Sequence, residues 1–361
     1  MKPRPPTAAS DATLAIAWAG LPPYAVACVR EFARLSGRSV LLIGTSPDTP
    51  FAPSESVAGV TMSWVDPADV AASWEGCLAS PPASFVVGGW HVPAFNALAR
   101  RVRRVGGRVA LMMDNRWRGD LRQRVAPFVF RTRYRGHYMA ALVPGKAARE
   151  YAIRLGMPKD RVFTGMYGAD PAVFSPGAPL PDRPSRFLFV GRLEERKGIR
   201  DLCEAWRRVH VSLPNWELRV IGCGPLRAEM PDLPRMTVKE FQQPGDLAPE
   251  YRAARFMVLP SHEDHWGLVV HEATLSGCGL VLSRNVGARL DLASDRNAIV
   301  VDPRRPDRLA EGLVSAARID GPSLHAVARE SVSLASGFGP AVFAASLGSV
   351  VDALGSSRRK A

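Results

Sequence analysis

Short apolar runs alternate with amphipathic stretches along the first half of the chain. Two stretches, 24–37 and 95–107, space their apolar residues as one face of a helix requires, and an arginine-rich helical segment follows residue 114. Runs typical of buried strands occupy 14–20, 39–45, 60–65, 83–90 and 108–114. Strands that alternate with helices in this way predict a parallel, doubly wound sheet.

The same alternation restarts after a proline-rich segment. The sequence GADPAVFSPGAPLPDRPSR holds five prolines and no periodicity, which is typical of a linker. Strand patterns then occupy 186–192, 216–224, 236–240, 253–261, 280–285 and 298–303. Helix patterns occupy 198–213, 267–279, 306–318 and 340–354. The second half therefore predicts another sheet of the same kind.

These patterns predict an α/β protein of two Rossmann-like domains that face each other across a cleft. We expect an N-terminal domain at 1–170, a linker at 171–185 and a C-terminal domain at 186–335. A final segment, 336–361, carries a helix that we expect to pack back on the N-terminal domain, followed by a basic tail. A ligand of such a protein lies in the cleft, outside the carboxyl ends of the strands.

Composition narrows the class of protein. With 361 residues, of which 47% are hydrophobic and 22% charged, the chain reads as a globular protein large enough for two cores. It has no apolar run near the roughly 20 residues of a membrane-spanning helix. Its five cysteines form no CxxC pair, which argues against a disulfide framework and a zinc site. We therefore expect a cytoplasmic protein.

The net charge of +13 is unevenly distributed. Between Arg100 and Arg135 twelve arginines stand against two aspartates. Such a block suits an anionic surface, for example phospholipid headgroups or a lipid-linked diphosphate. The alternatives are a solvated face and the arginine bias of a GC-rich genome. We expect peripheral association with the inner face of the membrane, and no nucleic-acid partner.

Two turns between a strand and a helix in the second half could approach a phosphate. FVGRLEERKG presents Arg192 and Lys197 just before a helix, as a diphosphate clamp would, although a surface turn paired with Glu194 and Glu195 is the alternative. In VIGCGPL, Gly222 and Gly224 allow a close approach of the backbone. The third glycine of the dinucleotide fingerprint is absent, which disfavours a nicotinamide dehydrogenase.

A third turn, in SHEDHWGLVVHEATLSGCG, combines two acids with a helix start. If the helix begins at Gly267, the N–H groups of Leu268 and Val269 point toward the cleft, between Asp264 in the loop and Glu272 on the second turn. A capping box formed by Ser261 and Asp264, with a solvated Glu272, is the alternative. Because the helix is otherwise apolar, its carboxylate needs a partner.

Several of these motifs resemble retaining glycosyltransferases of family 4, which have the GT-B fold. PSHEDHWGLVVHEATLSG is similar to that family's acid-x7-acid motif, VGRLEERKG to its phosphate-binding segment, and IGCGP, GADPAVFSPG and VGARLDLASDRNAIVVDP to motifs in the same order. The resemblance spans about 165–320. ALMMDNRWRGDLRQ and VPGKAAREYAIRLGMPKDRV in the first half also look like sugar-transferring relatives.

The resemblance implies a role for each matching residue. Arg192 and Lys197 would bind the donor diphosphate, Asp264 the hydroxyls of the donor sugar, and Glu272 the ribose. The backbone of Gly267, Leu268 and Val269 would hold the distal phosphate, with Gly222 and Gly224 nearby. In the first half, His91 would face the donor sugar and Gly20 would lie near the diphosphate. Here Asp264 replaces the family's usual Glu, which shortens the reach by one methylene.

We therefore expect an enzyme that moves a sugar from a nucleotide diphosphate donor to an acceptor with retention, in polysaccharide, glycolipid or other glycoconjugate biosynthesis. The resemblance implies no metal and no cofactor, and the arginine block suggests a lipid-linked or anionic saccharide acceptor. One alternative is a nucleotide-sugar epimerase or hydrolase of the same fold. The other is a non-catalytic nucleotide-sugar-binding partner of another transferase.

Overall fold

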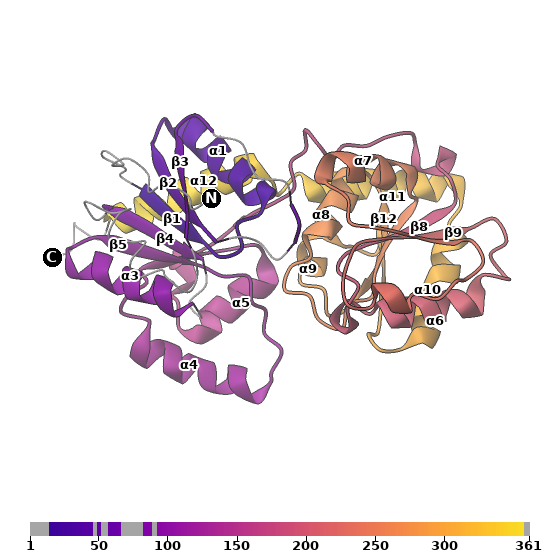
Figure 1. The fold of residues 1–361 in the computed structure, drawn as a ribbon, viewed down its shortest axis with the longest axis horizontal. Coiled ribbons are helices and arrows are strands. Elements are labelled where there is room, and N and C mark those ends of the chain that lie inside the picture. The colour runs from indigo at the N-terminus through magenta and orange to yellow at the C-terminus, as the bar shows by residue number, and fades with distance from the viewer. Residues whose placement is uncertain (1–13, 46–48, 52–56, 66–81, 89–91, 357–361) are drawn as a thin grey trace. The chain divides into compact units, whose positions relative to one another are not determined.

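The computed structural model describes residues 14–45, 49–51, 57–65, 82–88 and 92–356, and it divides the chain into two compact units (Figure 1). The first unit comprises 1–168 and 338–361, and the second comprises 169–337. Each unit has a parallel sheet with helices packed on it. The expected pair of Rossmann-like units is confirmed.

The first unit is built on a seven-stranded parallel sheet of order β3-β2-β1-β4-β5-β6-β7. Its strands are β1 (Leu14–Trp18), β2 (Val40–Gly44), β3 (Val60–Trp64), β4 (Ser84–Gly88), β5 (Arg108–Met112), β6 (Ala140–Val143) and β7 (Val162–Thr164). Its helices are α1 (Pro23–Ser36), α3 (Pro93–Arg104), α4 (Leu121–Arg133), α5 (Lys146–Leu155), the short 3-10 helix η1 (Lys159–Arg161) and α12 (Pro340–Ser356).

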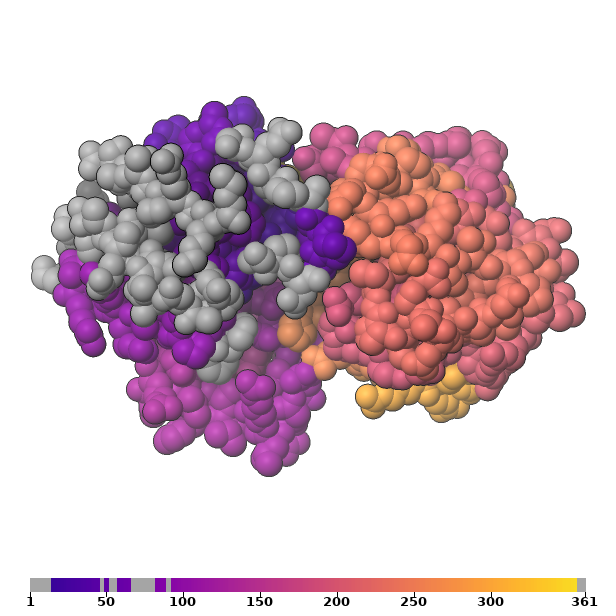
Figure 2. Space-filling view, viewed as in Figure 1, coloured from indigo at the N-terminus to yellow at the C-terminus, as the bar shows by residue number. Residues whose placement is uncertain are grey.

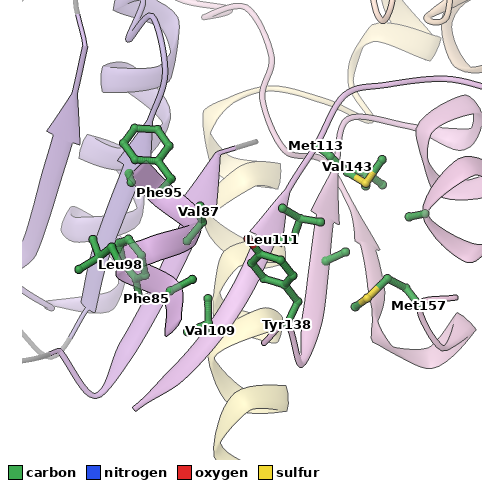
Figure 3. Close-up of a cluster of buried hydrophobic side chains, with 14 of the residues drawn as sticks. Phe85, Val87, Phe95, Leu98, Val109, Leu111, Met113, Tyr138, Val143 and Met157 are labelled. Atoms are coloured by element: carbon green, nitrogen blue, oxygen red, sulfur yellow. The ribbon is translucent and has the colours of Figure 1, made fainter. Parts of the chain in front are cut away.

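Continuous apolar sequence explains why β1 and β2 lie inside this sheet, since a strand covered by helices on both faces needs no polar alternation. Side chains from β4, β5 and α3 form a buried cluster with Tyr138 (Figure 3). The hydroxyl of Tyr138 donates a hydrogen bond of 2.6 Å to Oδ1 of Asn96 on α3, so these two polar groups within the apolar core are paired.

The second unit is built on a six-stranded parallel sheet of order β10-β9-β8-β11-β12-β13. Its strands are β8 (Arg186–Val190), β9 (Glu217–Ile221), β10 (Met236–Lys239), β11 (Phe256–Leu259), β12 (Gly279–Ser283) and β13 (Ala298–Val301). Its helices are α6 (Ile199–Val209), α7 (Pro244–Ala253), α8 (Leu268–Leu275), α9 (Arg289–Leu292), α10 (Pro306–Ala317) and α11 (Gly321–Ala335), with 3-10 helices η2 (Leu180–Asp182), η3 (Glu195–Lys197) and η4 (Arg227–Glu229).

The chain returns to the first unit with α12, which packs on α1 and on β5, β6 and β7. By length and composition alone, the helical run Gly321–Gly355 is sufficient to cross a membrane. It comprises α11 and α12, which are separated at 336–339. The apolar side chains of α12 are largely accounted for by packing, because Phe343, Leu347, Val350 and Leu354 are fully buried.

The proline-rich segment expected as a linker, 171–185, lies within the second unit. Buried Arg183 donates hydrogen bonds of 3.0 Å to the carbonyl oxygen of Ala254 and 2.8 Å to that of Ser276. These bonds attach the segment to the ends of α7 and α8.

The strand order fixes where a ligand can approach the second unit. From β8 the chain winds outward through β9 to β10, and it then resumes on the other side of β8 with β11. The loops that leave the carboxyl ends of β8 and β11 therefore lie at the point where the strand order reverses, which is the usual ligand position in an open α/β sheet.

Candidate functional site

The loops after β8 and β11 are in direct contact. Gly198, with φ of 69°, ends the first loop, and a Cβ atom there would lie 2.3 Å from the carbonyl oxygen of Pro260. The N–H of His262 donates a hydrogen bond of 2.9 Å to the carbonyl oxygen of Arg196. Glycine at 198 thus provides both the left-handed backbone conformation and the room for this approach.

A short ion pair joins these loops. Nζ of Lys197 lies 2.5 Å from Oδ2 of Asp264, and the two side chains are only 13% and 8% exposed. The Ser261 hydroxyl donates a 3.3 Å hydrogen bond to the same oxygen. Two residues that the sequence places 67 positions apart therefore form one charged centre at the switch point.

The capping box considered for Ser261 and Asp264 does not form. The N-cap of α8 is Gly267, with φ of 89° and no side-chain cap. The first N–H groups of the helix, which include those of the half-buried Leu268 and Val269, have no intrahelical partner by geometry. They carry the positive end of the helix dipole, which favours a bound anion.

Arg192 lies at the surface of the same region. Its side chain is 42% exposed, and its Nε lies 3.5 Å from Oε2 of Glu194. Glu194 also pairs with Arg196, at 2.9 Å. The alternative of a salt-bridged surface turn therefore holds for Arg192 and Glu194, whereas Glu195 pairs with Arg200. Arg192 remains accessible to a ligand on this turn.

Glu272 is buried on the second turn of α8, where its carboxylate contacts the side chain of Tyr251. Its Oε2 accepts a 2.8 Å hydrogen bond from the hydroxyl of Tyr251, a fully buried residue of α7. Burial raises the pKa of Glu272 to about 7, although the Tyr251 hydrogen bond opposes this rise. Burial, together with the charge of Glu272, raises the pKa of Tyr251 well above its usual range. Glu272 is thus not the solvated residue of the alternative interpretation.

Gly222 and Gly224 let one loop of the protein approach another. A Cβ on Gly222 would lie 1.9 Å from the carbonyl oxygen of Gly191, and one on Gly224 would lie 2.5 Å from that of Leu193. The N–H of Leu193 donates to the carbonyl of Cys223 at 2.9 Å. In this structure, the backbone that these glycines approach is that of the β8 loop, so their immediate role is to set its path.

In the first unit, Gly20 follows β1 with φ of 61°, and its N–H donates a 2.7 Å hydrogen bond to Oγ1 of Thr45. This position is at the carboxyl end of β1, beside the switch between β1 and β4. His91, the other candidate in this unit, lies outside the described residues.

The three histidines that lie near Asp264 and Glu272 in the sequence each contact a different partner. His262 Nε2 lies 2.5 Å from Oδ2 of Asp201, and His265 Nε2 lies 3.2 Å from Oε1 of Glu263. His271 accepts from the N–H of Ala169 and contacts the carbonyl oxygen of Ala335, both at 2.9 Å. Among the described residues, no group of three or more His, Cys, Asp or Glu is placed to hold a metal ion.

The sequence analysis named the two acids, Asp264 and Glu272, but it did not indicate Tyr251, the hydrogen-bond partner of Glu272, or Asp201, the partner of His262. Tyr251 lies on α7, a helix that the patterns did not indicate, and Asp201 lies on α6. Only strand order and helix packing bring these side chains to the site.

Comparison with solved structures identifies the fold. The sucrose-phosphate synthase of Thermosynechococcus elongatus is similar with a TM-score of 0.71 and 17% identity, over 95% of this chain and 100% of that one. Anabaena Alr3699/HepE, solved with UDP-glucose, is similar with a TM-score of 0.70 and 15% identity, over 95% and 99%. The two Rossmann-like units therefore have the architecture of GT-B glycosyltransferases.

Comparison of sequences identifies the second unit more closely. Residues 184–318 match the family described as Glycosyl transferases group 1. The D-inositol 3-phosphate glycosyltransferase of Corynebacterium kroppenstedtii is 32% identical over 173 residues, which cover 41% of this chain and 38% of that protein. An uncharacterized glycosyltransferase of Methanocaldococcus jannaschii, MJ1607, is 30% identical over 141 residues, which cover 37% and 36%. Each match thus spans less than half of the relative's length.

Proposed function

We propose that this protein is a retaining glycosyltransferase that transfers a sugar from a nucleotide diphosphate donor. The observation that carries the proposal is the contact of Lys197 with Asp264, beside the start of α8 and at the switch point of a glycosyl transferases group 1 domain. These groups match a sugar diphosphate. The cation and the helix N-terminus can bind its phosphates, and the carboxylate can accept hydrogen bonds from its sugar hydroxyls.

Each group has a defined part in the proposed reaction. The bond between the anomeric carbon and the diphosphate oxygen breaks, and its electron pair leaves with the diphosphate. Lys197, Arg192 and the N–H groups of Leu268 and Val269 stabilise that charge, which lowers the barrier to departure. The acceptor oxygen bonds to the same face of the sugar, and its proton passes to a donor phosphate oxygen.

The two acids bind the sugars on either side of the diphosphate. Asp264 accepts from hydroxyls of the donor sugar after Lys197 turns to the phosphate, and Glu272 accepts from the ribose. Because the pKa of Glu272 is raised to about 7, hydroxyl donors from the ribose favour its ionised form. Donor binding below pH 7 therefore releases a proton, which calorimetry in buffers of different ionisation enthalpy can measure.

The acceptor and the location are part of the same proposal. The arginines between Arg100 and Arg135 suit an anionic acceptor, such as a lipid-linked saccharide, at the cytoplasmic face of the membrane. Glycoconjugate biosynthesis is the corresponding pathway. Anabaena HepE, a structural relative, has been solved with UDP and with UDP-glucose, which supports a nucleotide-sugar donor and makes UDP-sugars the first to test.

The test begins with thermal shift against a panel of nucleotide sugars, followed by transfer assays with the donor that raises the melting temperature. Lys197→Ala and Arg192→Ala should lower turnover by about a hundredfold or more. The matched control is Arg200→Ala, because Arg200 is a surface cation of α6 that pairs with Glu195 and Glu229. It should retain turnover.

The outcomes separate the competing functions. Product formation from donor without any acceptor indicates an epimerase or hydrolase. Donor binding without turnover for every acceptor indicates a non-catalytic binding partner. If Lys197→Ala binds and transfers like the unaltered protein, the proposed site is wrong.

A further inference from the structure

Helix α4 of the first unit carries an exposed apolar stripe. Leu121, Val125 and Phe128 are 77%, 51% and 72% exposed. Their spacing of four and then three residues places them on one face of the helix. The opposite face packs inward through Gln123, Ala126 and Phe130, which are buried. The side chains of Leu121, Val125 and Phe128 therefore do not contribute to the hydrophobic core.

Arginines flank this stripe on both sides. At 3.6 residues per turn, Arg122 and Arg133 lie roughly a quarter-turn to one side, and Arg124 and Arg131 roughly a quarter-turn to the other. All four residues are exposed. Within the described part of the chain, none of them has an ion-pair partner. The stripe is thus bordered by unneutralised positive charge along its length.

The helix contains no acidic residue of its own. Its N-cap, Asp120, accepts from the N–H of Gln123 at 2.8 Å and pairs with Arg118 at 2.9 Å. The helix packs on α5 and lies at the periphery of its unit (Figure 1). In the space-filling view its atoms are at the outer surface of that unit (Figure 2). The surface is therefore apolar in the middle, cationic at both sides and accessible.

We propose that this face of α4 docks on an anionic phospholipid surface. Leu121, Val125 and Phe128 enter the boundary between headgroups and acyl chains, and the flanking arginines extend to the phosphates. Charge complementarity favours lipid over a protein partner, because a surface with uniform negative charge can match arginines on both sides of the stripe at once. The inference rests on the membrane location proposed above and assigns it to one helix.

The first test is co-sedimentation with vesicles of phosphatidylglycerol and phosphatidylcholine, and with phosphatidylcholine alone. The protein should bind the mixed vesicles and lose this binding at high salt. Leu121→Ser/Phe128→Ser should weaken binding at least tenfold. Arg122→Gln/Arg131→Gln should remove most of the preference for anionic lipid. Val211→Ser is the matched control, because Val211 is 78% exposed on the second unit, and it should bind within twofold of the unaltered protein.

A second test reports insertion directly. Phe128→Trp places an indole on the stripe, and vesicles with brominated acyl chains should quench its fluorescence. Val211→Trp should show no quenching beyond that of the native tryptophans. Melting curves of all variants confirm folding, and each position is exposed.

Three results would overturn the proposal: no binding of the unaltered protein to anionic vesicles, equal binding by Leu121→Ser/Phe128→Ser, or a change of oligomeric state in that variant without vesicles. The last result would assign the stripe to a protein interface. Calorimetry of nucleotide-sugar binding separates this failure from failure of the proposed function. The α4 variants should bind donor normally whether or not they bind lipid, because Arg192, Lys197 and Glu272, the groups proposed to bind the diphosphate and the ribose, lie in the other unit.

Discussion

Glu272 combines a buried position with a carboxyl group that could ionise near neutrality. Its pKa in the folded protein is about 7, above the usual value of 4.5, because burial disfavours the charged form. As pH rises from 4.5 to 7, the unfolded chain loses this proton first. The stability contributed by the group is therefore present below pH 4.5 and falls until about pH 7. Burial of this carboxyl group therefore lowers the stability of the fold at neutral pH. A role of Glu272 in ligand binding would explain why such a residue is present.

The variant Glu272→Gln tests this account. The amide stays neutral and its oxygen can still accept from Tyr251, so the variant should lack the pH-dependent loss. Between pH 5 and pH 8 its free energy of unfolding should rise relative to the unaltered protein by about 2–3 kcal/mol. Urea unfolding of the second unit at both pH values measures this. A constant difference would show that Glu272 is ionised throughout.

His271, the preceding residue, has the opposite dependence. Burial lowers its pKa to about 4, and its two ring nitrogens contact the backbone of Ala169 and Ala335 near the two ends of the second unit. A depressed histidine pKa means that the unfolded chain takes up the proton first. Stability is therefore full above pH 6.5 and falls as pH drops toward 4.

His271→Leu should destabilise the second unit by about 2–4 kcal/mol at pH 7, since it leaves a buried N–H and a buried carbonyl without partners. At pH 5 the gap to the unaltered protein should narrow by about 2 kcal/mol, because only the latter loses stability on acidification. The measurement is urea unfolding at the two pH values. His325→Leu is the control, since His325 lies on the exposed side of α11, and it should show neither effect.

The candidate site shows how far single residues could be identified from sequence. Arg192, Lys197 and Asp264 were proposed from the sequence because they occur at turns between strands and helices, and Glu272 because it is the one carboxylate of an apolar helix that follows such a turn. The direct contact between Lys197 and Asp264 was not, because spacing along a chain does not give the order of strands in a sheet. Nor could sequence show that the neighbours of Gly222 and Gly224 are protein backbone.

At the scale of elements, most strands were predictable from continuous apolar sequence, but the patterns did not assign β6, β7, α5, α7, α9 or α11. Every strand pattern named in either half corresponds to an observed strand. Helix α7 was missed because its sequence, PGDLAPEYRA, carries two prolines and a glycine, which favour a turn locally. Tertiary packing overrides that preference through buried Leu247, Ala248 and Tyr251. The weakest local pattern thus supplies the partner of Glu272.

Contact between the β8 and β11 loops can be tested with a pair of glycines that share a backbone conformation. Gly198 and Gly37 have φ of 69° and 65°, but a Cβ at 198 meets the carbonyl oxygen of Pro260 at 2.3 Å, whereas one at 37 meets nothing within 4 Å. Both Ala variants incur the left-handed strain of about 1 kcal/mol. Gly198→Ala should lose a further 1–3 kcal/mol from the clash, together with donor affinity. Equal melting temperatures for the two variants would contradict this packing account.

For the whole molecule, the division into two units predicts separable stabilities. Each unit has its own sheet, and the chain completes the first unit only with α12, after it has passed through the second. Leu347 of α12 is fully buried, so Leu347→Ala should destabilise the first unit by about 2–5 kcal/mol. Ser349→Ala, at an exposed position of the same helix, is the control and should have little effect.

Hydrogen exchange reads the two units separately. In Leu347→Ala, peptides from α1 and from β5 to β7 should exchange faster, because α12 packs on these elements. Peptides from α8 should keep their protection from exchange. A bound nucleotide sugar should increase the protection of α8, and it should not restore the protection that the first unit loses in this variant. Faster exchange in α8 to the same extent would mean that the units unfold together. In that case donor binding should also stabilise the first unit, and the same experiment would show it.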